Sequence, residues 1–246
     1  MDRAMLAANS LKPLTSHVVT TMSNAPNLLN DDGSASMATA IMMSHHAFRR
    51  DLARFAKALE RIAAGDTARA DAVREEWVKF RAALHGHHEA EDNGVFPNLA
   101  REHESARATI EKLGADHRRI DPLLERGDRV FAELPKTDEA LAVVQELSEL
   151  LHPHLAIEEA ELIPFLRSAK EFPTPQSDEV AELYAQGFSW AMNGIAPDVL
   201  EKVNEMLPDS LRVRLPAARA AFAARCERVW GSATGGAART PIPNAL

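Results

Sequence analysis

The chain has 246 residues, with 28 Lys and Arg against 36 Asp and Glu, and a formal net charge of −8. This acidity disfavours binding to nucleic-acid phosphates. Its single cysteine, Cys226, excludes an intrachain disulfide framework and a zinc site built on several thiolates. Aromatic residues make up only 5% of the chain, which disfavours an all-β fold and favours helices. With no long apolar run and no signal-peptide pattern, we expect a cytoplasmic protein without nucleic-acid or membrane partners.

Composition divides the chain into four parts. Residues 1–34 are polar and irregular, so we expect an N-terminal arm there. Residues 35–172 carry long helical patterns, and a stretch containing two prolines near residue 173 separates them from a C-terminal helical extension over 173–232. Residues 233–246 have the composition of a disordered tail. In the extension we expect three shorter helices, over 177–192, 197–207 and 211–230.

Within 35–172, apolar residues recur in alternating steps of four and three, the spacing of a buried helix seam. The first helix is expected over 35–64 and ends at Gly65. A break is expected near Asn93-Gly94, where the second seam ends, and Pro135 follows the third. Four such seams with short connections predict an all-α fold, an antiparallel up-down four-helix bundle with additional C-terminal helices.

Six polar residues interrupt these apolar seams. They are His45, His87, Glu91, His117, His154 and Glu158. Each glutamate follows a histidine by four residues, so the two side chains share a helix face. A buried His–Glu hydrogen bond explains one such pair, but two pairs and two further histidines favour a metal site. At about 1.5 Å of rise per residue, all four histidines fall in one layer of the bundle, which suits two metal ions.

The polar seam positions also belong to an internal repeat. Residues 85–99 and 152–166 share the pattern H-x-H-x-x-x-E-D/E, followed by an apolar residue and a proline. Upstream, His45 and Phe48 match His117 and Ile120. Each half is a helix pair, so the repeat predicts a site of approximate two-fold symmetry.

This order of motifs closely resembles the bacterial hemerythrin-like HHE cation-binding family, over about residues 40–172. The resemblance implies a four-helix bundle around a non-haem centre of two iron ions, bridged by oxo or hydroxo, that binds O2, peroxide or nitric oxide. It also implies that the six seam residues are the ligands, with Glu91 and Glu158 bridging the ions. Imidazole and carboxylate would suit zinc or manganese as well, so the choice of iron depends on the resemblance.

The sequence departs from the oxygen-carrying hemerythrins at one position. Their third helix supplies a second histidine four residues after the first, whereas here Asp121 follows His117 at that spacing. This disfavours reversible O2 carriage alone. Two functions remain open: a di-iron oxidoreductase that dismutates peroxide, as catalase does, and a metal- or gas-responsive sensor read out by the C-terminal helices.

Several neighbouring residues are alternatives to the predicted ligands. The seam spacing and the repeat favour His45 over His46. We expect His88 to flank the site, because the second repeat has Leu155 at the equivalent position.

The acids next to the predicted ligands are left open. Asp92 and Glu159 are either acceptors for ligand N–H groups or solvated surface residues. Asp121 is a further candidate ligand or acceptor. The arginine-rich segment after residue 211 is interpreted as a solvated helix face or a homodimer contact.

Overall fold

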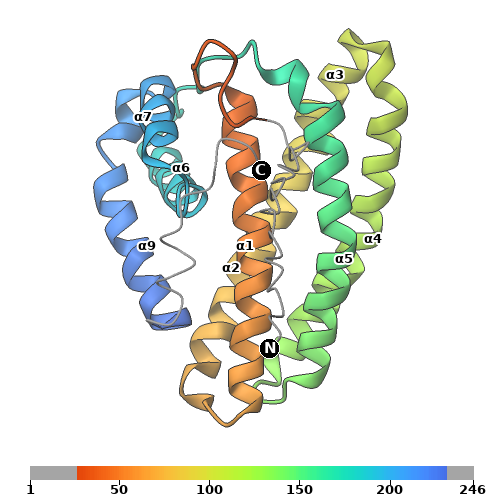
Figure 1. Ribbon diagram of the computed structural model, residues 1–246, viewed down its shortest axis with the longest axis vertical. Coiled ribbons are helices and arrows are strands. Elements are labelled where there is room, and N and C mark those ends of the chain that lie inside the picture. The colour runs from red at the N-terminus through yellow and green to blue at the C-terminus, as the bar shows by residue number, and fades with distance from the viewer. Residues whose placement is uncertain (1–26, 232–246) are drawn as a thin grey trace, which may run out of the picture.

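The computed structural model describes residues 27–231, and the regular elements in that range are helical (Figure 1). Most of the expected arm and all of the expected tail lie outside the described residues. Within the described range, none of the helices combines the length and apolarity that a membrane span requires.

Four long helices form the bundle: α1 (Met37–Ala63), α2 (Ala70–Ala90), α4 (Arg107–Ala132) and α5 (Asp138–Glu161). Contacts of α1 with α2 and α5, and of α4 with the same two helices, close the ring. The short helix η1 (Thr67–Arg69) joins α1 to α2 after Gly65, whose φ of +105° favours glycine. The predicted all-α bundle is therefore confirmed.

The core of the bundle is built from the predicted seams. Trp77 stacks on Phe131 with ring centroids 4.3 Å apart, and Phe55 meets Trp77 edge-on at 5.7 Å. Gly127 of α4 lets this indole approach closely, because a Cβ added there would lie 1.9 Å from the ring of Trp77. This apolar packing stabilises the end of the bundle where α1 joins α2, next to the polar layer.

The connection from α2 to α4 differs from our prediction. The expected break at Asn93-Gly94 is wrong, because the backbone continues through the π-helical turn η2 (Glu91–Val95) into α3 (Phe96–Glu102). Pro97 fits because it lies in the first turn of α3, where its missing N–H is not needed. The single turn η3 (Glu104–Ala106) then leads into α4. Such π-helical turns re-aim nearby side chains and are frequent at functional sites.

After α5 and the short helix η4 (Ile163–Leu166), the chain forms α6 (Asp178–Ala191), α7 (Pro197–Met206), α8 (Asp209–Arg212) and α9 (Leu215–Trp230). The first two expected helices of the extension are confirmed. The helix expected over 211–230 is present as α9 but begins later, at Leu215, because Pro216 lacks an N–H and fits only the first turn of a helix.

The extension packs against the bundle (Figure 1). Helix α6 lies on α1, and α9 lies on α2 and α6. Met43 of α1 and Val199 of α7 are fully buried in a second apolar core. Asp51 of α1 accepts a hydrogen bond of 2.7 Å from Trp190 Nε1, and Arg50 donates to the carbonyl oxygen of Trp190 at 3.1 Å. Both apolar and polar contacts thus fix α6 on α1.

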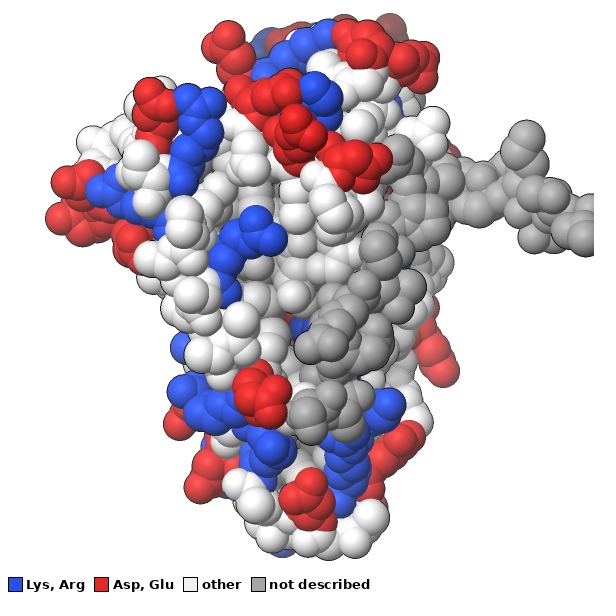
Figure 2. Space-filling model, turned by 60° about the vertical axis from the view of Figure 1, so that its left-hand side comes forward, with Lys and Arg blue, Asp and Glu red and all other residues white. Residues whose placement is uncertain are grey.

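Charges of both signs are intermixed on the face of the extension drawn in Figure 2. Lys and Arg side chains lie beside Asp and Glu near the two ends of this face. Interspersed charges give no strong field of one sign over the face shown.

Candidate metal centre

All six polar seam residues converge between the bundle helices. His45 comes from α1, His87 from α2, Glu91 from the start of η2 and His117 from α4, while α5 supplies the remaining pair, His154 and Glu158. His87 has a side chain that is 13% exposed, whereas the other five are buried. The structure therefore brings the predicted set into one buried layer.

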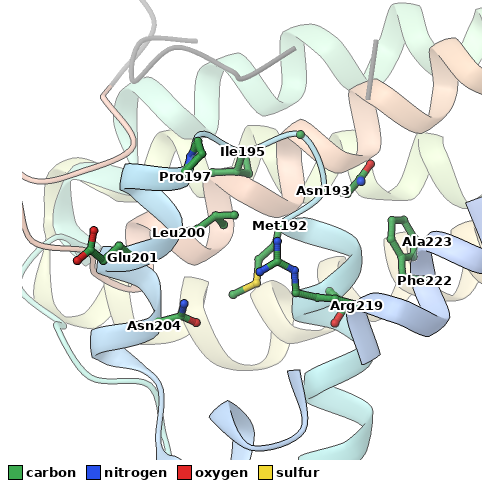
Figure 3. Close-up of a pocket in the computed structure, with 12 residues that line it drawn as sticks. Met192, Asn193, Ile195, Pro197, Leu200, Glu201, Asn204, Arg219, Phe222 and Ala223 are labelled. Carbon is green, nitrogen blue, oxygen red and sulfur yellow. The ribbon is translucent and has the colours of Figure 1, made fainter. Parts of the chain in front are cut away.

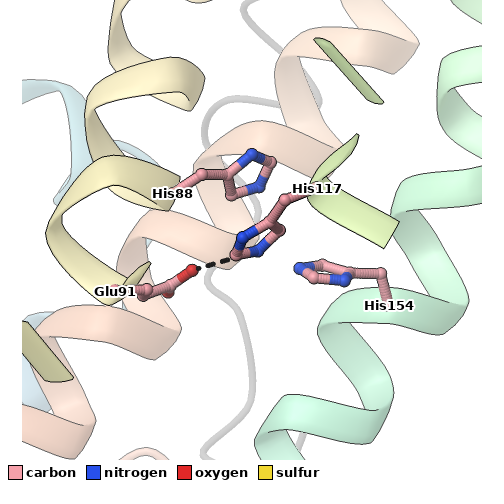
Figure 4. A group of neighbouring side chains, drawn as sticks. All are labelled: His88, Glu91, His117 and His154. Carbon is pink, nitrogen blue, oxygen red and sulfur yellow. Dashed lines mark ion pairs between the residues drawn. The ribbon is translucent and has the colours of Figure 1, made fainter. Parts of the chain in front are cut away.

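A first group of possible ligands consists of His88, Glu91, His117 and His154, each offering one atom within 4.8 Å of the others. Figure 4 shows the three imidazoles facing one another across the layer, with the Glu91 carboxylate beside His117. The Glu91 Oε2 atom is 3.5 Å from His117 Nε2. The rings of His88 and His117 are stacked, with centroids 4.0 Å apart.

A second group consists of His45, His87, Glu91 and Glu158, within the same limit of 4.8 Å. His87 Nε2 is 2.9 Å from Glu91 Oε1, and His45 Nε2 is 3.3 Å from Glu158 Oε2. Glu91 thus belongs to both groups, with one carboxylate oxygen near each. Glu158, which we also expected to bridge, belongs to the second group alone.

Two further carboxylates contact the outer nitrogens of the histidine rings. Glu159 Oε1 is 3.0 Å from His45 Nδ1, and Arg49 holds the same carboxylate with bonds of 2.6 and 3.1 Å. Asp92 Oδ1 is 3.0 Å from His117 Nδ1. A carboxylate on Nδ1 fixes the ring and leaves Nε2 free to bind a cation. Of the two alternatives left open for Asp92 and Glu159, the geometry favours the acceptor role.

His88 is the residue that sequence reasoning missed. Its side chain is buried and lies in the first group, although we expected it to flank the site. The equivalent residue in the second repeat, Leu155, does not predict the position of His88. Leu155 is also fully buried, but it packs in the apolar core. A signal was present in the spacing, since His88 lies three residues before Glu91 and the two share a helix face.

The remaining alternatives lie away from both groups. His46 is half-buried and faces the extension, where a Cβ added to Gly194 would lie 3.3 Å from its Nε2 atom. Asp121 is half exposed and lies 3.7 Å from His85 Nδ1. The preference for His45 over His46 therefore agrees with the position of each ring.

Burial and crowding set the protonation of the cluster. Burial opposes the charge on His45, but Glu158 and Glu159 outweigh it and raise its pKa to about 10. Burial also opposes ionisation of Glu158, yet His45 prevails and lowers that pKa to about 2. Burial and neighbouring imidazoles lower the pKa of His154 to about 4 and depress that of His88 strongly. Neutral His88 and His154 and ionised Glu158 are in the forms that bind metals, whereas His45 must lose its proton to do so.

The cluster leaves buried polar atoms without hydrogen-bond partners among the described residues. These atoms are His45 Nε2, His87 Nε2, both ring nitrogens of His88 and of His154, His117 Nε2, both oxygens of Glu91 and Oε2 of Glu158. Some of these atoms lie within ion-pair distance of one another, as His87 Nε2 and Glu91 Oε1 do. Such groups are costly to bury unless something binds them. Imidazole nitrogens and carboxylate oxygens converging in this way fit metal ions.

The site can be compared with known proteins. The family model described as Hemerythrin HHE cation binding domain matches residues 36–166, more than half of the chain. The matched range runs from the N-cap of α1 to the end of η4 and includes both groups of possible ligands. Comparisons with curated proteins and with solved structures give no match.

Proposed function

Because the chain belongs to the hemerythrin HHE cation-binding family, we propose that its two residue groups hold a pair of iron ions that bind O2, peroxide or nitric oxide. The observation that carries the proposal is the position of Glu91, which lies in both groups. One carboxylate shared by two sets of imidazoles is what a centre of two ions requires.

In this proposal His88, His117 and His154 hold one ion, while His45, His87 and Glu158 hold the other. Glu91 contacts both ions. When bound, iron supplies one-electron redox chemistry and open positions for small ligands. The chain positions the rings, since Glu159 fixes His45 and Asp92 fixes His117.

The surrounding residues also keep bulk water from the centre. Six of the seven possible ligands are buried, and only His87 has a partly exposed side chain among them. Phe48 covers His87, with ring centroids 5.2 Å apart, and Phe96 stacks on His117 at 5.8 Å. In this proposal only molecules as small as O2 or peroxide reach the centre. We propose the dismutation of hydrogen peroxide to O2 and water as its reaction.

A specific contact favours a second function, sensing. Trp190 of α6 lies 4.9 Å from Phe48, which in turn packs on His87. A change at the second group would therefore reach the extension through two side chains. We propose as the alternative that the extension reads out the state of the centre.

Three broader properties are also proposals. The single cysteine suits a reducing compartment, which agrees with a cytoplasmic location. The second proposal is that the partner of this protein is a small ligand: O2, peroxide or nitric oxide. The third proposal is a homodimer that forms through α9, which bears several arginines. Sedimentation would show this dimer as a doubled mass.

The two functions are separated by one set of measurements on full-length, iron-loaded protein. Peroxide consumption that is lost in Glu91→Gln but kept in the exposed neighbour variant Glu89→Gln would support the oxidoreductase. Absence of turnover, together with altered amide exchange in α6 and α9 after addition of nitric oxide, would support the sensor. Protein without iron and without an optical change on addition of peroxide or nitric oxide would contradict both.

A further inference from the structure

A cavity of about 630 Å³ lies outside the histidine cluster, between α1, α2 and α6. Its size falls in the range of about 300–1,000 Å³ that is usual for small-molecule sites. Most of its wall is apolar. The larger apolar or aromatic side chains include Met37, Ile41, Phe80, Tyr184, Phe188 and Trp190.

Two mid-helix glycines widen this cavity, Gly86 of α2 and Gly187 of α6. Glycine costs a helix about 1 kcal/mol relative to alanine, so its place in a helix interior usually has a packing reason. Gly127 has one, because a side chain there would collide with Trp77. At Gly86 and Gly187 an added Cβ would meet no heavy atom of the surrounding chain within 4 Å. Both glycines are exposed, and the wall of the cavity is open where their side chains would stand.

A second cavity contains a glycine that has a different explanation. It has a volume of about 590 Å³ and lies within the extension, between α7, α9 and the α6–α7 connection (Figure 3). Its glycine, Gly194, has a φ of +93°, so the backbone conformation accounts for that residue. Gly86 and Gly187 lie in regular helices and have no such explanation.

Charged residues from α2 and α9 also line the first cavity: Glu76, Lys79 and Arg225. Glu76 is 4% exposed, and its Oε2 atom is 3.3 Å from Arg225 Nε. Both of these atoms lack a hydrogen-bond partner among the described residues, so this ion pair is incomplete. Lys79 lies on the next turn of α2, which gives two cations against one carboxylate. Burial raises the pKa of Glu76.

We propose that this cavity binds an amphipathic organic acid, whose apolar body lies along α1, α2 and α6 and whose carboxylate meets Arg225 and Lys79. The site is separate from the metal centre but near it. Phe80 and Trp190 line the cavity, and each packs on Phe48, at 5.9 and 4.9 Å between ring centroids. Phe48 in turn contacts His87. A bound acid would thus lie two side chains away from a possible metal ligand.

The test is calorimetric titration of the full-length protein with three twelve-carbon amphiphiles, two below their micelle concentrations and dodecanol below its solubility limit. These are dodecanoate, dodecanol and dodecyltrimethylammonium. We expect one dodecanoate per chain, bound at least about tenfold more tightly than the other two, because only the anion meets the excess positive charge. Lys79→Gln should weaken dodecanoate binding and leave dodecanol binding unchanged.

Filling the cavity gives the matched variants. Gly187→Leu and Gly86→Leu should each weaken dodecanoate binding at least about tenfold, since the added side chain takes the place of the apolar body. Val213→Leu adds a methylene group at a residue that is 71% exposed and does not line the cavity, so it should bind as the wild type does.

Three results would overturn the proposal: wild-type protein that shows no saturable binding, undiminished binding in both glycine variants, or equal affinity for all three amphiphiles. Circular dichroism checks that the variants fold. If one glycine variant fails to fold, the other carries the test. If neither glycine variant folds, these positions lack the open space that the proposal requires, and the proposal is overturned as well. The titration needs no iron, so its outcome is independent of the proposed metal chemistry.

Discussion

Removal of the metal should destabilise the whole bundle. Seven side chains of the cluster carry buried polar atoms without hydrogen-bond partners among the described residues. At about 1 kcal/mol for each side chain, the low end for an unpartnered buried group, the metal-free cluster costs about 7 kcal/mol. A ligand at 1,000 times its dissociation constant stabilises the native state by about 4 kcal/mol. The smaller of these two free energies, about 4 kcal/mol, sets the stabilisation that we expect from iron. It corresponds to a rise in Tm of about 8–16 °C for a chain of this size.

The assay is thermal unfolding, followed by circular dichroism, of protein treated with a chelator and of the same protein reloaded with ferrous iron under argon. Reloading with magnesium is the control, because Mg²⁺ prefers oxygen ligands and should leave Tm unchanged. A difference in Tm below about 2 °C between iron-loaded and chelated protein would refute the reasoning.

Three further predictions concern single residues. His88→Ala should reduce bound iron from two ions toward one per chain, whereas His152→Ala, at a residue outside both groups, should leave it unchanged; equal iron contents would argue against a ligand role for His88. Gly127→Ala should destabilise the protein, because overpacking against Trp77 costs about 1–3 kcal/mol and outweighs a helix gain of about 1 kcal/mol; a higher denaturant midpoint would contradict this. Trp190→Ala should cost about 3 kcal/mol in urea unfolding through lost packing on the bundle, and an unchanged midpoint would show that α6 contributes little.

The polar layer of the bundle could be predicted from local sequence patterns. A helix repeats every 3.6 residues, so the steps of three and four fix which side chains share its buried face. His45 and His117 fall on those faces by this rule alone. The repeated His–Glu spacing adds Glu91 and Glu158, and the structure places all four in one layer.

His88 shows where local patterns fail. His87 and His88 are adjacent on α2, about 100° apart around the helix, so a seam includes only one of them. Both reach the layer because the cluster is wide: His87 faces the second group and His88 the first. The repeat also failed as a guide, since the position equivalent to His88 holds Leu155 in the apolar core. The two halves of the site are therefore less symmetric than the two halves of the sequence.

The seating of the extension could not be predicted at all. It depends on pairs far apart in the chain, such as Asp51 with Trp190 and Arg50 with the carbonyl oxygen of Asn193. No short-range pattern encodes such pairs. The same is true of the cavity beside α6, whose wall combines residues from α1, α2, α6 and α9.

The most direct test of the central claim is the iron content per chain, measured by mass spectrometry on anaerobically reconstituted protein. The proposed centre predicts two iron ions per wild-type chain and two in the control Glu89→Gln. It predicts a clear loss of iron in Glu91→Gln, because an uncharged amide has one oxygen and cannot replace a carboxylate shared by both groups. Fewer than one iron ion per wild-type chain, or an undiminished content in Glu91→Gln, would contradict a paired metal centre built around Glu91.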